Sequence, residues 1–221
     1  MKRHSTPLLL VWCLYPLSVL LLHFTQGERW RAAEGALFSR TQALVFEQEG
    51  RLQKAAQCYR TAEAALLPDD LPGRARLKID AARVAILQGE AFEGVENMER
   101  LLAPSHGKAL PKPLRTEANA TRALGLYYAA YALRLDNNEP DLWQQEAAEA
   151  RAIFLKLHEQ ARRSNLPDEA ALYGRNLEAA IRLQRGKLAE IAVNPPPPAS
   201  LAARDRSVFH KKMERLERRG S

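Results

Sequence analysis

The sequence predicts an all-α protein with an N-terminal transmembrane helix, a stack of antiparallel helix pairs, a proline-rich linker and a basic C-terminal helix. The commonest residues, Ala, Leu, Arg, Glu and Gln, favour helices, and β-branched residues are sparse. Apolar residues recur at helical spacing in long segments that glycine or proline interrupts. Because 46% of the 221 residues are hydrophobic and 27% are charged, the chain can bury the core of one sizeable domain.

The first part, residues 1–27, contains an apolar run at 8–24 without Asp, Glu, Lys or Arg. At 1.5 Å per residue this run makes about 26 Å of helix, close to the hydrocarbon core of a bilayer at roughly 30 Å. We interpret it as an uncleaved signal anchor, which would make the protein a single-pass membrane protein. Two alternatives stay open: a signal peptide cleaved near Gly27, and a buried helix of a soluble protein.

The charges on either side of this run bear on its orientation. Lys2 and Arg3 precede it, whereas Arg29, Arg31 and Arg40 follow it. A very short basic N-terminus most often stays in the cytoplasm. We therefore expect the rest of the chain on the extracytoplasmic side.

The second part, residues 28–193, is the expected helical domain. Gly50 and Gly89 each mark a turn, and a small residue, Ala55 or Gly94, follows five positions later. Antiparallel helices joined by so few residues need a glycine at the bend and small side chains where their backbones approach. The helices are expected at residues 29–49, 52–67, 74–88, 91–103, 114–135, 141–163 and 168–193.

Residues 36–104 resemble the tetratricopeptide repeat family. The first repeat carries the small and aromatic residues and the turn glycine of that family: Ala43, Phe46, Gly50, Ala55, Tyr59 and Ala62, with Pro68 after them. The second repeat matches at fewer positions: Ala82, Ala85, Gly89, Gly94 and Pro104. Met98 and Leu101 replace its expected aromatic and small residues, and later breaks are spaced more widely than 34 residues. An unrelated helical bundle is the alternative.

This resemblance implies a stack of helix pairs, a solenoid, with a concave groove that binds a protein partner. The positions of the first helix in each pair would line the groove. These are Arg40, Leu44, Glu47, Ile79, Arg83 and Ile86. For Leu44, Ile79 and Ile86 the alternative is a place in the ordinary core.

Aromatic residues form a broad band on two of the expected helices. Tyr127, Tyr128 and Tyr131 share the fifth helix, and Trp143 and Phe154 the sixth. We expect them to pack against each other, with a ligand pocket as the alternative.

The last two parts are the linker at 194–199, which contains four consecutive prolines, and the basic tail at 200–221. A proline run forms a stiff extended spacer. The tail is compatible with a helix that has a thin apolar stripe, and it can contact a protein, a membrane or nucleic acid, or remain a solvated end. Its candidate contact residues are Arg204, Arg206, Lys211, Lys212 and Arg215.

The sequence offers no catalytic, cofactor or metal-binding motif. It has no glycine-rich phosphate loop and no paired-histidine zinc motif, its five histidines are scattered, and it has two cysteines. The net charge of +7 resides mainly at the two ends of the chain, which argues against nucleic acid as the main partner. We therefore expect a non-enzymatic, membrane-anchored scaffold or assembly factor that binds a protein. The alternative is a regulator that binds nucleic acid through the basic tail.

Overall fold

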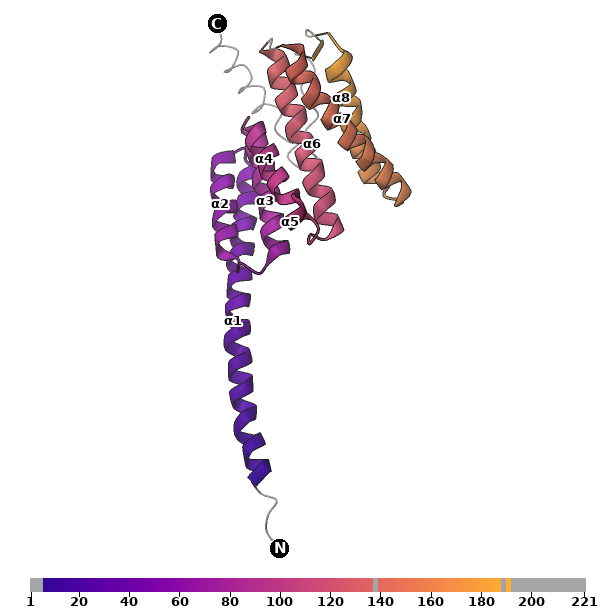
Figure 1. Ribbon diagram of the computed structural model, residues 1–221. Helices are drawn as coiled ribbons and strands as arrows, with labels where there is room; N and C mark the ends of the chain where they lie inside the picture. Colours follow the sequence, from indigo (N-terminus) through magenta and orange to yellow (C-terminus); the bar gives the residue numbers. More distant parts are fainter. Residues whose placement is uncertain (1–5, 137–138, 188–189, 192–221) are drawn as a thin grey trace.

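The computed structural model describes residues 6–136, 139–187 and 190–191, and the regular elements in these residues are all helices (Figure 1). Before Arg29, Tyr15 is the one residue whose side chain is described. The expected linker and basic tail lie outside the described residues. The helices are α1 (Thr6–Gln48), α2 (Leu52–Ala65), α3 (Leu71–Leu87), α4 (Ala91–Leu102), the one-turn α5 (Pro104–Gly107), α6 (Lys112–Leu135), α7 (Pro140–Arg163) and α8 (Pro167–Arg185).

Most helix boundaries fall within two residues of the expected ones. Apart from α1, which begins well before residue 29, two boundaries differ more, and both differences have local causes. Helix α3 begins earlier than expected because the side chain of Asp70 accepts a hydrogen bond from the Gly73 amide at 2.9 Å. Pro72 fits this first turn because its position there requires no amide hydrogen. Helix α8 ends at Arg185, well before residue 193, because Gly186 adopts an extended backbone.

Helix α1 passes through Gly27 without a break. The expected boundary between anchor and helical domain therefore lies inside one helix of 43 residues. At 1.5 Å per residue its length is about 65 Å. Figure 1 shows the first half of α1 extending beyond the other helices as a stalk.

Among the residues that the structure describes, no helix combines the length and the apolar character needed to cross a bilayer. The structure thus gives no support to the transmembrane helix expected at 8–24. Apart from Tyr15, the side chains of that run lie outside the described residues.

Three of the turns between helices contain one residue in the left-handed backbone conformation. Gly50, Gly89 and Asn165 have φ angles of 72°, 88° and 54°. At each turn this residue and the next one donate to carbonyl oxygens three and five positions earlier, for example Arg51 N to Phe46 O at 2.8 Å. This is the Schellman motif, which ends a helix and reverses the chain. The expected roles of Gly50 and Gly89 as turn glycines are confirmed.

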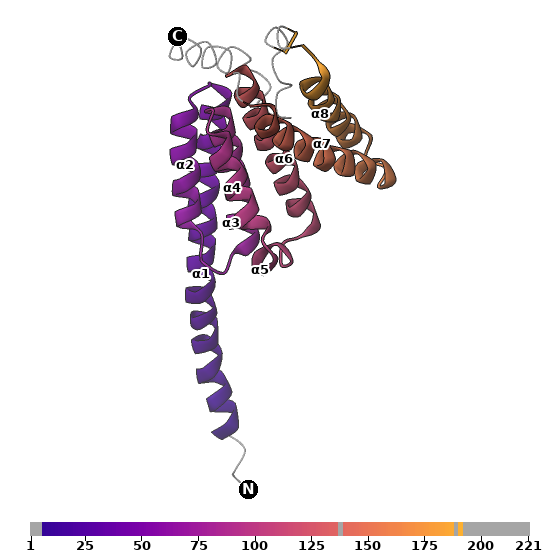
Figure 2. The same cartoon turned by 45° about the horizontal axis from the view of Figure 1, so that its top comes forward.

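The helices stack in chain order. Each long helix packs on its neighbours in the sequence, and α6 contacts both α3 and α4. In Figures 1 and 2 the chain rises through α1, α3, α6 and α8 and descends through α2, α4 and α7. The buried residues form three successive clusters, centred on Tyr59 between α1, α2 and α3, on Met98 between α3, α4 and α6, and on Phe154 between α6, α7 and α8. This packing, in which contacts stay local along the stack, resembles that of helical-repeat proteins.

Two glycines allow the middle of the stack to pack closely. A Cβ atom on Gly94 of α4 would lie 2.5 Å from Ile86 Cγ1, and one on Gly125 of α6 would lie 2.7 Å from Val95 Cγ2. Both distances are far below van der Waals contact. The backbones of α3, α4 and α6 thus approach closely because these positions have no side chain.

Candidate functional site

The apolar residues of the expected groove lie in the interior. Ile79 and Ile86 are completely buried, Ile79 in the Met98 cluster and Ile86 against Gly94 and Gly125. Leu44 is partly buried against the Tyr59 cluster. A role for Ile79 and Ile86 in lining an open groove is therefore wrong, because the later helices cover the face on which they lie. The alternative interpretation as core residues is confirmed for these two.

The charged residues of the expected groove form a buried ion network between α1 and α3. The guanidinium of Arg83 donates to Glu47 Oε1 and Oε2, both at 3.0 Å, and to Asp80 Oδ1 at 2.9 Å. Arg40 Nε donates to the other Asp80 oxygen at 2.9 Å. The Tyr59 hydroxyl of α2 donates to Glu47 Oε2 at 2.9 Å, so the network joins three helices.

This network is neutral, because two arginines face two carboxylates. The side chains of Glu47 and Asp80 are only 6% and 3% exposed. Burial by itself would lower the pKa of Arg83, but its bonds to Glu47 and the charge of Asp80 raise it. Burial and the Glu47 carboxylate raise the pKa of Tyr59 well above the usual range. Arg83 is therefore charged and the Tyr59 hydroxyl keeps its proton at neutral pH, and the network links helices rather than presenting charge to a partner.

The aromatic band packs as expected. Tyr127, Tyr128 and Tyr131 are buried, as are Trp143 and Phe154. The ring centroids of Tyr127 and Tyr128 lie 5.9 Å apart in an edge-to-face arrangement. These rings form the core between α6 and α7.

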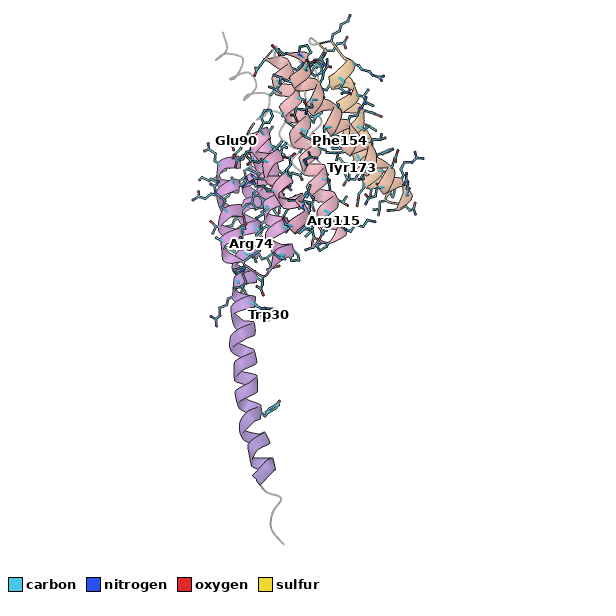
Figure 3. All side chains as sticks on the ribbon, viewed as in Figure 1. Trp30, Arg74, Glu90, Arg115, Phe154 and Tyr173 are labelled. Carbon is cyan, nitrogen blue, oxygen red and sulfur yellow. The ribbon has the colours of Figure 1, made fainter. Side chains whose placement is uncertain are left out.

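An open hollow that the sequence did not predict lies between α6, α7 and α8. Its volume is about 540 Å³. We call it the α6–α8 cleft. It is lined by the first turns of α6, the last turns of α7 and the start of α8: Lys112, Pro113, Thr116, Glu117, Leu157, Gln160, Ala161, Ser164, Leu166, Glu169 and Tyr173. Figure 3 labels Arg115 near the start of α6 and Tyr173 in α8, the two helices that flank it.

The cleft has an apolar base and a polar rim. Leu157, Ala161 and Tyr173 are at most 7% exposed, and they contribute the apolar surface. Leu166 is 43% exposed and adds apolar surface among the more open residues of the lining. Glu117 is already paired with Arg76 of α3. The other two charged residues of the lining, Lys112 and Glu169, are exposed, so a partner would meet apolar surface at the base and charge at the rim.

Tyr173 is the titratable group of the apolar base. Burial, together with the carboxylates of Glu169 and Glu117, raises the pKa of Tyr173 to about 12. Its hydroxyl is thus neutral at physiological pH and can donate a hydrogen bond.

A histidine links α7 to α8 near the cleft. His158 Nδ1 lies 2.7 Å from the Ala170 carbonyl oxygen. Because a carbonyl oxygen only accepts, Nδ1 must carry the hydrogen. A Cβ atom on Gly174 would lie 3.3 Å from the His158 ring, so the glycine permits the imidazole to sit between the two helices.

A second, smaller hollow of about 380 Å³ lies between α2, α3 and α4. Its charged side chains include both signs, with Arg60, Lys78 and Arg100 among the lining residues. Gln88 also lines it, and the Nε2 atom of Gln88 is buried without a hydrogen-bond partner in the described part of the chain. This hollow offers less apolar surface relative to polar surface than the α6–α8 cleft does.

No group of three His, Cys, Asp or Glu side chains among the described residues is arranged to hold a metal ion. The candidate contacts of the basic tail lie outside the described residues: Arg204, Arg206, Lys211, Lys212 and Arg215.

No family model, no curated protein and no solved structure matches this chain.

The α6–α8 cleft could not be found from the sequence because it forms between the start of α6 and the turn that joins α7 to α8, which are far apart in the chain. The available signals were local ones: Pro113 and Pro167 at helix starts, and the left-handed turn at Asn165. They place helix ends correctly. They do not predict that the turn between α7 and α8 stands away from the start of α6 and leaves a cleft there.

Proposed function

We propose that this chain is a non-enzymatic, membrane-anchored scaffold or assembly factor that holds a segment of a protein partner in the α6–α8 cleft. Three things support this proposal. The helices pack as in helical-repeat proteins, residues 36–104 resemble tetratricopeptide repeats, and the run at 8–24 has the composition of a membrane anchor. In this proposal the stacked helices lie on the extracytoplasmic side.

The observation that carries the proposal is the apolar base of the cleft. An open hollow of about 540 Å³ falls in the size range of small-molecule pockets, roughly 300–1,000 Å³, so it has room for one or two large side chains of a partner. Leu157, Ala161 and Tyr173 provide the apolar base, while Gln160 and Ser164 supply hydrogen-bonding groups. Such a site suits a partner segment that inserts one or two large apolar side chains and makes its backbone hydrogen bonds internally, as an amphipathic helix does.

Site-specific photo-crosslinking in cells tests the cleft. A photoreactive phenylalanine analogue is placed at Gln160 in the cleft, and in a control at Arg151, an exposed position on the opposite side of α7. We expect a discrete adduct of higher mass from position 160 and none from position 151. The same adducts from both positions, or none from either, would contradict the proposal.

A blocking substitution links the adduct to the shape of the cleft. Thr116→Trp adds a large ring at a partly exposed lining position, whereas Arg115→Trp adds the same ring at an exposed position that does not line the cleft. The adduct from position 160 should disappear with Thr116→Trp and persist with Arg115→Trp. Loss with both variants, or with neither, would remove the cleft as the binding site.

Carbonate extraction and protease accessibility of the full-length chain test the anchor. We expect the protein to stay with the membrane pellet and its stacked helices to be digested only from the extracytoplasmic side. Release of the intact chain by carbonate would exclude the membrane anchor.

A further inference from the structure

The two ends of the helical stack differ in their outer surfaces. Helix α8 closes one end, and its exposed positions are mostly charged: Asp168, Glu169, Arg175, Glu178, Arg182 and Arg185. Helix α1 closes the other end, and its exposed positions include large apolar side chains. Terminal helices of a stack normally carry a polar outer face, because the apolar face of an end unit has no further neighbour. Helix α8 meets this requirement, and α1 does not.

The exposed apolar residues of α1 lie on one side of the helix. Trp30, Leu37, Phe38 and Val45 are 74%, 62%, 64% and 47% exposed. At 100° per residue these four positions fall within about 100° of the helix circumference. They lie roughly opposite Ala36 and Ala43, which are buried against the stack. We call these four residues the outer face of α1.

The bilayer is not placed to cover this face. Measured from residue 24 at 1.5 Å per residue, Trp30 lies about 9 Å along the helix, Phe38 about 21 Å and Val45 about 32 Å. Trp30 is near enough to reach a membrane interface. Phe38 and Val45 stand beside the stacked helices, at the level where α1 packs on α2 and α3. Figure 3 labels Trp30 where the stalk meets the stack.

We propose that a second copy of this chain covers the outer face of α1, so that two α1 helices pack side by side in the same direction. The proposal rests on the membrane anchor of the proposed function, because α1 is continuous with residues 8–24. Two copies anchored in one membrane emerge parallel and at the same height. Each then presents the same face to the other, as the twofold symmetry of a dimer requires.

The spacing and charge of this face suit such a pair. Trp30 and Leu37, and likewise Phe38 and Val45, are seven positions apart, so each pair recurs on the same side of the helix, as contacting residues do in helices that cross at a shallow angle. Glu34 lies within the face, and Arg31, exposed at its edge, is one turn away. In a parallel pair at equal height, Glu34 of one copy lies within a turn of Arg31 of the other. The two Glu34 side chains also approach each other near the twofold axis, and the Arg31 of the other copy offsets each of these negative charges.

Disulfide trapping of the full-length, membrane-inserted chain tests the dimer. In a background with Cys13→Ser and Cys58→Ala, a Thr41→Cys variant places a thiol between Phe38 and Val45. Gln42→Cys is the matched control, because it moves the thiol about 100° around the same helix. We expect mild oxidation to give a covalent dimer several-fold more efficiently with Thr41→Cys. Equal yields from both variants, or no dimer from either, would overturn the proposal.

Sedimentation of the full-length chain in mild detergent provides a second measurement. The unmodified protein should be a dimer, and Phe38→Glu should be a monomer with unchanged far-UV circular dichroism, because this side chain contributes nothing to the core. A monomeric unmodified protein would overturn the dimer. A fluorophore attached at Thr41→Cys would then identify the cover. If the fluorophore became solvated on deletion of residues 194–221, the tail would cover the face. If its emission shifted on addition of vesicles, the bilayer would cover it.

The outcomes of the two proposals can be separated. A chain that stays monomeric but still gives a Gln160 adduct loses the dimer and keeps the scaffold function. A chain that gives the Thr41→Cys dimer without a Gln160 adduct keeps the dimer and loses the cleft as a partner site. Release by carbonate would remove the anchor on which both depend.

Discussion

Removing Arg83 should destabilise the folded protein more than removing a charged residue from the surface does. Arg83 makes three hydrogen bonds to Glu47 and Asp80, whose side chains are 6% and 3% exposed. Arg83→Met keeps most of the side-chain volume, but it changes the network from neutral to a charge of −1. Breaking a buried ion pair by removing one partner costs about 3–5 kcal/mol. Because Arg40 still neutralises Asp80, we expect about 3 kcal/mol.

Urea unfolding of the full-length chain in mild detergent, followed by far-UV circular dichroism, measures this loss. A loss of about 3 kcal/mol corresponds to roughly a 150-fold change in the folding equilibrium at 1.36 kcal/mol per factor of ten. Arg163→Met is the surface control, because Arg163 and Glu159 pair at exposed positions on α7. It should change stability by no more than about 0.5 kcal/mol.

A double variant separates the unpaired charge from lost packing. Glu47→Gln removes the carboxylate that Arg83→Met leaves without a cation, so the double variant should be more stable than Arg83→Met alone. Two results would refute the reasoning. One is an Arg83→Met protein within about 1 kcal/mol of the unmodified chain, and the other is no recovery in the double variant.

Three further predictions concern the turns, the helix packing and the effect of pH. Gly50→Ala should lower the free energy of unfolding by about 1–2 kcal/mol, because the φ angle of Gly50 is 72° and alanine disfavours it. Asn165→Gly, at a φ of 54°, should be neutral or slightly stabilising. Urea unfolding tests both variants. Gly125→Ala should lower the free energy of unfolding by about 1–3 kcal/mol, because the added Cβ overpacks against Val95. Adding Val95→Ala should restore part of this loss, and a double-mutant cycle in which the two effects are additive would contradict the prediction. Burial and two nearby glutamates raise the pKa of Glu146, so stability should fall as pH rises through its titration. Glu146→Gln should raise the melting temperature at neutral pH but not in acid, and equal effects at both would contradict this.

The local structure of this protein was predictable from its sequence. Gly50 and Gly89 ended helices at the expected places, because only the residue at the bend decides whether the backbone can adopt positive φ there. The aromatic residues of α6 and α7 were also expected to pack together, since each helix presents them on one apolar face.

The same reasoning placed Arg40, Glu47 and Arg83 in a groove open to a partner, and it did not single out Asp80. A charged residue on an apolar helix face can line a groove or meet an opposite charge on a neighbouring helix, and sequence spacing is the same in both cases. Here α3 packs so that Arg83 and Asp80 meet Glu47 and Arg40 of α1. One signal was available, the opposite charges three positions apart at Asp80 and Arg83.

The sequence by itself determined that the chain forms helices, where Gly50 and Gly89 reverse it, and which faces are apolar, because these properties depend on neighbours within a few residues. Only the tertiary structure decided which apolar faces were buried. It enclosed Ile79 and Ile86, left Phe38 and Val45 of α1 exposed, and opened a cleft beside Tyr173. The reason is physical: burial depends on the angles at which separate helices pack, and those angles are set by contacts between residues far apart in the chain.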